Sequence, residues 1–176
     1  MNCDHCGAPL NIAEGRDCYY CEYCGSYSYP TPNEDGVALL GEASTYPCPV
    51  CKTPLVPALV KSVHICSCPT CRGNLVSQSA MLPILREAQP QNWIGEDPPP
   101  LPDQTEFKRS LRCPVCQKLM EAYPYGGPGN IIIQGCAGCR YIWLDYGELA
   151  RIIRFYFQTY NHPPDERGAK RRRIVF

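Results

Sequence analysis

The chain has 176 residues, and its 17 basic and 17 acidic side chains give a formal net charge of zero. No uninterrupted apolar run approaches the roughly 20 residues of a membrane-spanning helix, so we expect no membrane segment. The apolar residues are scattered among 19 prolines. This composition argues against a single large hydrophobic core and favours small units that need an additional staple.

Cysteines account for 14 of the residues, which is enough to form a framework. The N-terminal stretch MNCDHCGAPL has neither the basic region nor the apolar region of a signal peptide. We therefore expect a cytoplasmic protein in a reducing compartment, where disulfides are disfavoured. Metal binding is then the better interpretation of the cysteines.

Six Cys-x-x-Cys pairs follow one another along the chain and form three sets, with 14, 16 and 19 residues between the two pairs of a set. This spacing predicts three zinc ribbons, which are small β-hairpin units each held by one ion. The predicted ligands are Cys3, Cys6, Cys21, Cys24, Cys48, Cys51, Cys68, Cys71, Cys113, Cys116, Cys136 and Cys139.

The predicted fold is small, metal-stabilised and β-rich, with three tandem ribbons and an amphipathic C-terminal α-helix. The expected segments are residues 1–29 (ribbon 1), 30–46 (linker), 47–88 (ribbon 2 with a short helix), 89–111 (Pro-rich linker), 112–162 (ribbon 3 with the C-terminal helix) and 163–176 (basic tail).

Two cysteines lie outside the sets. Cys18 has the same spacing to Cys21 as Cys21 has to Cys24, but Gly25 favours the second pair because a tight turn needs a left-handed residue there. Cys66 lies on a strand-like stretch. For Cys18 and Cys66 we expect small buried side chains, with a reserve ligand or an oxidation sensor as the alternative.

Ribbons 2 and 3 are related in sequence. CPVCKTPL at Cys48 parallels CPVCQKLM at Cys113, and each ribbon carries an N-cap type residue, Ser77 or Asp145, six positions after its last cysteine. The Pro-rich linker favours an extended polyproline II spacer. We interpret that linker as a passive tether, with docking of Trp93 on a partner as the alternative.

The last ribbon precedes the clearest helical pattern of the chain. Asp145 and Glu148 form a capping signal. Apolar residues then recur at helical spacing up to about Asn161, before two prolines. The additional aromatic residues Phe155 and Phe157 widen this apolar surface, so we expect part of it to contact a partner or a second copy of the chain.

Four thiolates at this spacing suit a tetrahedral zinc ion, and a rubredoxin-like iron centre is the main alternative. Because the protein supplies all four ligands, no coordination position is left for a substrate. We therefore expect three structural zinc ions, each contributing on the order of 10 kcal/mol to folding.

One family resemblance rests on ribbon 3. A C-P-x-C turn at Cys113, a C-x-x-C turn at Cys136 and the run WLDYGEL from Trp143 to Leu149 resemble the bacterial zinc-ribbon family related to the ribbon of general transcription factor IIB. Ribbon 2 resembles a degenerate copy of the same family motif, whereas ribbon 1 resembles only generic zinc ribbons. The resemblance implies a zinc-binding fold, and it does not transfer promoter binding.

Three filled sites would add negative charge, because Zn²⁺ with four thiolates carries −2; this argues against broad electrostatic binding to nucleic acid. No catalytic triad or phosphate-binding glycine motif stands out, so we expect no enzymatic activity. Our main hypothesis is an adaptor that presents its hairpins and C-terminal helix to a larger protein assembly. The alternative is a DNA- or RNA-binding accessory factor, related to transcription, that uses ribbon 2 and the basic tail.

The residues expected to contact a protein partner or nucleic acid are basic residues of ribbon 2 and the tail, together with two aromatic residues of the helix. They are Lys52, Lys61, Arg72, Arg86, Lys170, Arg171, Arg172, Arg173, Phe155 and Phe157.

Overall fold

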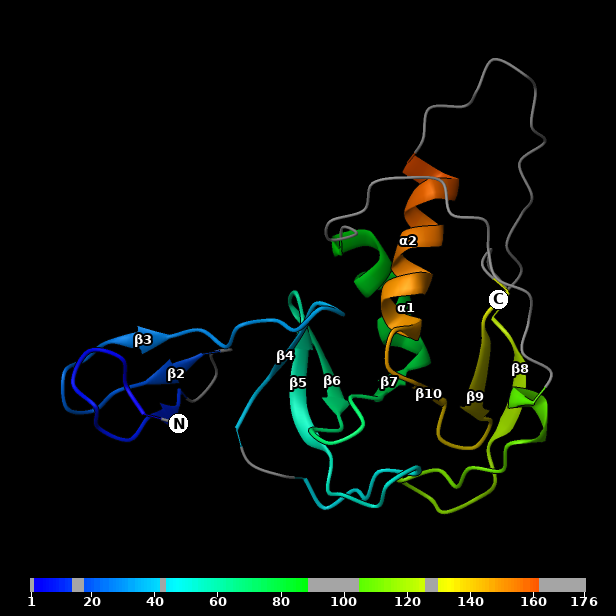
Figure 1. Cartoon of the computed structure of the whole chain (residues 1–176), viewed down its shortest axis with the longest axis horizontal. Helices are drawn as coiled ribbons and strands as arrows, with labels where there is room; N and C mark the ends of the chain where they lie inside the picture. The colour runs from blue at the N-terminus through cyan, green and yellow to red at the C-terminus, as the bar shows by residue number, and fades with distance from the viewer. Residues whose placement is uncertain (1, 14–17, 42–43, 89–104, 126–129, 162–176) are drawn as a thin grey trace.

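A computed structural model of the chain describes residues 2–13, 18–41, 44–88, 105–125 and 130–161, and Figure 1 shows their arrangement. A small sheet contains three strands: β1 (Asn11–Ile12), β2 (Tyr19–Tyr20) and β3 (Tyr27–Ser28). A large sheet contains seven strands: β4 (Val37–Leu39), β5 (Val56–Val60), β6 (Val63–Ser67), β7 (Asn74–Ser77), β8 (Glu121–Pro124), β9 (Ile132–Cys136) and β10 (Tyr141–Leu144). The helical elements are α1 (Gln78–Glu87), the 3-10 helix η1 (Glu106–Lys108) and α2 (Glu148–Asn161).

Each of the six Cys-x-x-Cys turns is closed by a backbone hydrogen bond. The residue after the second cysteine donates its N–H to the carbonyl oxygen of the first, as Gly7 does to Cys3 at 2.8 Å and Arg72 does to Cys68 at 2.9 Å. This residue has a positive φ in every turn. Glycine fills the position in ribbon 1, as predicted, whereas ribbons 2 and 3 use the side-chain-bearing residues Lys52, Arg72, Gln117 and Arg140, with φ between 56° and 68°.

Ribbons 2 and 3 share one sheet, which corrects the expectation of three separate units along the chain. The strand order is β4-β5-β6-β7-β10-β9-β8, so the last strand of ribbon 2 pairs with the last strand of ribbon 3. Leu75 and Trp143 each stand four residues after the last cysteine of their ribbon, and these two equivalent residues lie opposite each other in the antiparallel pair. The two ribbons are therefore related by an approximate two-fold axis that passes between Leu75 and Trp143.

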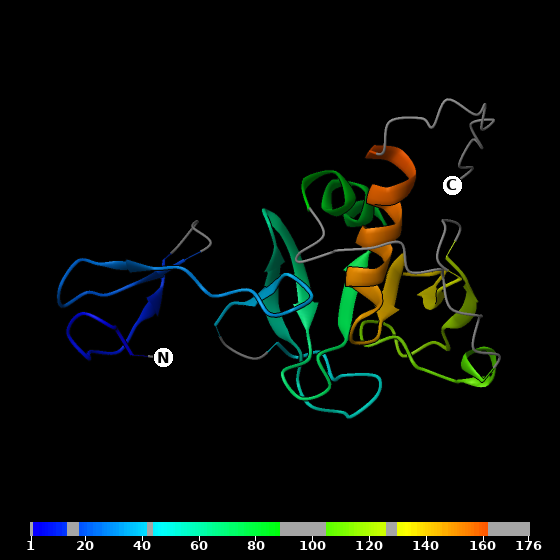
Figure 2. The same ribbon diagram turned by 45° about the horizontal axis from the view of Figure 1, so that its top comes forward.

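The helices cover one face of the large sheet, as Figure 2 shows. They bury a hydrophobic core that draws on both ribbons, so the expectation that this chain lacks a sizeable core is wrong for ribbons 2 and 3. The buried core residues include Val60, Ile65, Val76, Met81, Ile84, Leu85, Ile133, Ile142, Leu144, Leu149, Ile152, Ile153 and Phe155.

The apolar stripe of α2 is thus occupied within the chain. Phe155 is 6% exposed and belongs to the core, so it is unavailable to a partner, contrary to the sequence-based expectation. Phe157 is half-buried. Both helix starts follow the predicted capping: the N–H of Ala80 donates to Ser77 Oγ at 3.2 Å, and the N–H of Asp145 donates to the Glu148 carboxylate at 2.8 Å.

The two edges of the large sheet are protected in different ways. On the ribbon 2 side, the edge strand is β4, whose three residues were expected to belong to a linker; so short a strand offers little backbone to another strand. On the ribbon 3 side, Tyr125 donates its N–H inward to Ile131 at 2.7 Å, which directs the backbone of Pro124 outward because successive residues of a strand bond to opposite sides. Proline has no N–H to offer there, so this edge resists the addition of another strand.

The described end of the Pro-rich linker is packed against ribbon 3. Leu111 is buried, and the guanidinium of Arg109 pairs with the carboxylate of Asp145. Trp93 and the basic tail lie outside the described residues, so the expectations for them stay predictions. In the part of the chain that the structure covers, no helix has the length and apolar character to cross a membrane.

Ribbon 1 projects from the rest of the molecule (Figure 1). It is joined to the large sheet through Tyr19, whose hydroxyl accepts the N–H of Gly41 at 2.7 Å and donates to the carbonyl of Leu39 at 3.4 Å. The side chain of Ile12 packs against Gly41, where there is no room for a Cβ atom. Residues 30–41, which were expected to belong to a linker, thus form a structured connection between the two sheets.

Candidate metal centres and the surfaces around them

The twelve paired cysteines gather in three clusters of four. Within each cluster the sulfur atoms lie within 4.8 Å of one another, and the closest pairs are separated by 3.4 to 3.6 Å. A tetrahedral zinc ion with Zn–S bonds of about 2.3 Å requires sulfur separations of about 3.8 Å. The clusters are therefore compatible with three structural zinc ions, and the predicted fold class and cofactor are confirmed.

Hydrogen bonds lower the pKa of at least one thiol in each cluster, and of both Cys3 and Cys24 in ribbon 1. The side chain and backbone N–H of Thr53 lower the pKa of Cys51 to about 6. The Ser26 hydroxyl is the main cause that lowers the pKa of Cys3 to about 6, and the backbone N–H of Lys118 is the main cause that lowers the pKa of Cys116 to about 7. Because the thiolate is the metal-binding form, these hydrogen bonds favour metal binding.

The two remaining cysteines lie apart from these clusters among the described residues. Cys18 is buried in ribbon 1, and the geometry assigns Cys21 and Cys24 to the cluster, as the turn argument predicted. Cys66 lies on β6, where burial raises the pKa of its thiol, a property of an unreactive side chain.

The clusters of ribbons 2 and 3 are in contact through buried side chains. Leu75 and Trp143, together with Leu55, Leu111 and Met120, form one buried cluster with cysteines of both ribbons. Gly73 is required for this packing, because a Cβ atom there would lie within 2.9 Å of three atoms of the Trp143 indole. The indole N–H donates to Asp145 at 3.0 Å. The sequence offered one signal for this contact, the equivalent positions of Leu75 and Trp143 in the repeat.

The predicted basic patch of ribbon 2 is divided. Lys52 and Arg72 lie in the cysteine turns, whereas Lys61 lies between β5 and β6 and Arg86 in the last turn of α1. Ribbon 3 instead adds basic residues that the sequence analysis did not select. We define the knuckle edge as the four cysteine turns of ribbons 2 and 3, residues 47–54, 68–73, 112–119 and 136–141. Its basic residues, all exposed, are Lys52, Arg72, Arg112, Lys118 and Arg140.

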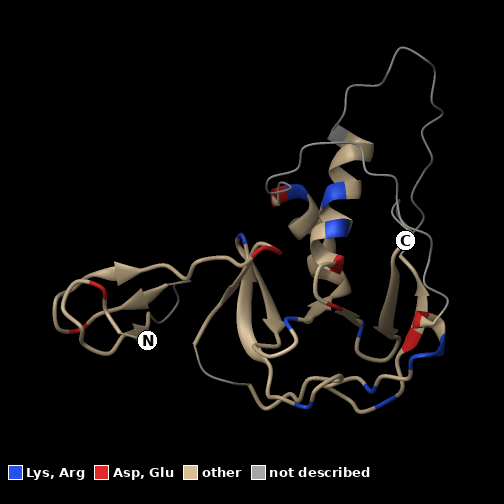
Figure 3. Cartoon of the chain, in the orientation of Figure 1, with Lys and Arg blue, Asp and Glu red and all other residues tan. Residues whose placement is uncertain are grey.

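The knuckle edge contains no Asp or Glu. Figure 3 shows its blue segments along the rim of the large sheet that faces away from the free ends of the helices. Apolar side chains are exposed between the cations, among them Val50 at 39% and Leu119 at 61%. The edge therefore combines positive charge with aliphatic surface.

Ribbon 1 has the opposite character. We define the ribbon 1 surface by its exposed acidic and aromatic side chains: Asp4, Glu22, Tyr23, Tyr27 and Tyr29. Tyr23 is 85% exposed and Tyr29 is 74% exposed. None of the described residues of ribbon 1, in 2–13 and 18–29, is Lys or Arg.

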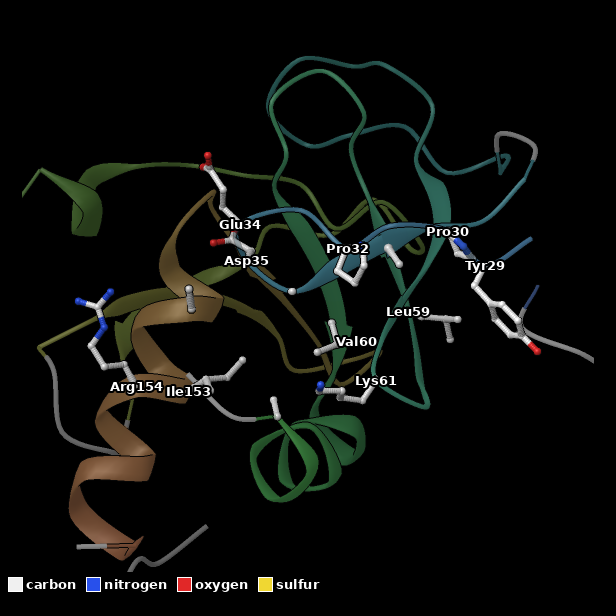
Figure 4. Close-up of a pocket in the computed structure, with 14 residues that line it drawn as sticks. Tyr29, Pro30, Pro32, Glu34, Asp35, Leu59, Val60, Lys61, Ile153 and Arg154 are labelled. Carbon is white, nitrogen blue, oxygen red and sulfur yellow. The ribbon is translucent and has the colours of Figure 1, made fainter. Parts of the chain in front are cut away.

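A cavity of about 310 Å³ lies where the segment after ribbon 1 meets the helices (Figure 4). Its lining is mainly apolar, with Leu59 and Ile153 on opposite sides, and this volume is at the lower limit for small-molecule sites. The acidic residues at its rim are already engaged. Asp35 accepts the N–H of Gly147 at 2.9 Å and thus caps α2, and the carboxylate of Glu34 accepts the hydroxyl of Tyr146.

Comparison with known proteins identifies two segments. Residues 47–87 and 112–154 each match the family described as transcription factor zinc-finger, the TFIIB-type zinc ribbon. The resemblance proposed for ribbons 2 and 3 is thereby confirmed, and ribbon 1 lies outside the matched segments. No curated protein and no solved structure matches the chain.

Proposed function

Because two of its segments are zinc ribbons of a transcription-factor type, we propose that the protein is a non-catalytic adaptor that joins components of a larger protein assembly. All four ligands of every predicted site come from cysteines, so the metal has no free position for a substrate and its role is structural. This argument favours binding over catalysis.

The observation that carries the proposal is the contrast between the two surfaces. The ribbon 1 surface is acidic and aromatic, and the knuckle edge is basic and aliphatic. Exposed side chains of opposite charge at two places on one chain fit two different partners, because like charges across an interface are strongly disfavoured. Exposed tyrosines are also typical of binding sites in protein interfaces.

A test is affinity purification of the zinc-loaded full chain after nuclease treatment. Replacement of Tyr23 and Tyr29 by alanine removes the most exposed aromatic side chains of ribbon 1 and leaves the cysteines unchanged. We expect at least one protein to be retained by the native chain and lost by this variant or by a knuckle-edge variant. Retention of no protein that either variant loses would overturn the adaptor proposal.

The second candidate function is a nucleic-acid accessory factor, and the five cations of the knuckle edge favour it. The same measurement without nuclease, repeated at increasing salt concentration, separates the two functions, since phosphate contacts weaken steeply with salt.

A further inference from the structure

From the chemistry of the knuckle edge, we infer that it is the docking site for a protein segment in which acidic and apolar residues alternate. This inference rests on the proposed adaptor function and specifies the chemistry of one partner. It depends on three properties of the edge: its shape as one continuous rim, its charge, and the aliphatic side chains between the charges.

The rim is continuous because the two ribbons are joined. Pairing of β7 with β10 and the buried contact of Leu75 with Trp143 connect the cysteine clusters of both ribbons. Arg72 and Arg140 are equivalent in the repeat, since each follows the last cysteine of its ribbon and has a positive φ. Neither ribbon alone would present the whole set of cations.

The charge favours local ion pairs over a long-range field. Each zinc ion with four thiolates carries −2, so two filled sites offset about four of the five cations of the edge. A nucleic acid gains its affinity from the summed neutralisation of many phosphates, and this nearly balanced edge offers little of that. Individual carboxylates can still pair with exposed guanidinium and ammonium groups at short range.

The aliphatic side chains point to the same partner. Val50 and Leu119 are exposed between the cations, and burial of such side chains against apolar groups of a partner contributes roughly 25 cal/mol per Å². Single-stranded nucleic acid binds instead by stacking its bases on aromatic rings. The guanidinium of Arg72 lies over the nearby ring of Tyr146, which remains 41% exposed, and its central carbon is 5.1 Å from the ring centroid, so one place where a base could stack is occupied.

The test is selection of peptides from a random display library on the zinc-loaded full chain, followed by fluorescence anisotropy with the selected peptides. We expect enrichment of Asp and Glu interleaved with Leu, Ile or Phe. Charge reversal of Arg112 and Lys118 to Glu should weaken binding at least about tenfold. The matched control, Lys61→Glu with Arg86→Glu, changes the charge equally at two exposed positions away from the edge and should alter binding less than about twofold.

A zinc content equal to that of the native chain shows that both charge-reversal variants are folded. A further variant, Arg112→Gln with Lys118→Gln, removes the same two charges without reversing them. Selected peptides without acidic character, or peptides equally affected by both charge reversals, would overturn the inference. Competition by duplex DNA or single-stranded RNA at physiological salt would assign the edge to nucleic acid instead. Peptides that lose binding only when Tyr23 and Tyr29 are replaced would refute this site and leave the adaptor function intact.

Discussion

Replacement of Gly73 by alanine tests the joined structure of ribbons 2 and 3. An added Cβ atom would lie within 2.9 Å of three atoms of Trp143, which is fully buried. Non-bonded carbon atoms are ordinarily separated by at least about 3.5 Å, so the indole ring of Trp143 has to move. Overpacking of this kind costs about 1–3 kcal/mol in free energy of unfolding.

The assay is urea unfolding of the zinc-loaded full chain in a Trp93→Phe background, in which Trp143 is the remaining tryptophan and its fluorescence reports the contact. Gly138→Ala is the matched control, because a Cβ atom there meets only the side chain of Lys118, at 3.9 Å. We expect Gly73→Ala to lower the free energy of unfolding by at least about 1 kcal/mol relative to this control.

Gly73, the residue that is replaced, lies in ribbon 2, whereas Trp143, the residue that is displaced, lies in ribbon 3. Loss of zinc to a chelator should therefore accelerate in both ribbons of the variant. A loss of stability equal to that of Gly138→Ala, or an effect confined to ribbon 2, would refute the reasoning.

Three further predictions concern single side chains. Burial raises the pKa of the Glu148 carboxyl group to about 7 from 4.5. The folded state therefore holds the proton of Glu148 more tightly than the unfolded state does. The contribution of Glu148 to the free energy of unfolding consequently falls as the pH rises from about 4.5 to about 7. Glu148→Gln keeps the capping acceptor, so its stability relative to the native chain should increase by about 1 kcal/mol between about pH 6 and pH 8 in urea unfolding, and a pH-independent difference would contradict this cause. Asp35→Ala removes the cap of α2 and should lower the free energy of unfolding by about 1 kcal/mol, with a smaller loss for Asp35→Asn. An equal loss in both variants would argue against the hydrogen bond from Gly147 to Asp35. Pro124→Val restores an outward N–H on β8 and should increase self-association in light scattering, whereas an unchanged mass at high concentration would show that proline is not what protects this edge.

The metal centres could be predicted from the sequence because their ligands come in fixed local spacings. Cys48 and Cys51 lie in one turn, and that turn has the same hydrogen bonds wherever it occurs. Helix α2 was predictable for a similar reason, since the capping pair of Asp145 and Glu148 and the apolar period of the helix are local.

The pairing of the ribbons could not be predicted in the same way. Strands of four residues such as β7 and β10 carry too little pattern to specify a partner, and the register depends on contacts such as Trp143 against Gly73. Strand β4 could not be predicted either, because it has only three residues and lies within a polar segment. The cap that Asp35 provides at Gly147 was also unpredictable, because these residues are separated by 112 positions in the sequence. The knuckle edge depends on this pairing, so its cations could not be grouped before the sheet was known.

The most direct test of the account is zinc release from ribbon 2 in the presence and absence of the ribbon 3 site. In a chain with Cys3 and Cys6 replaced by serine, we expect two equivalents of zinc per chain. Further replacement of Cys113 and Cys116 by serine should leave one equivalent, which a chelator removes at least about tenfold faster, equivalent to about 1.4 kcal/mol of coupling between the ribbons. An unchanged release rate would contradict the joined structure, and zinc contents well below these values would contradict the three Cys₄ sites.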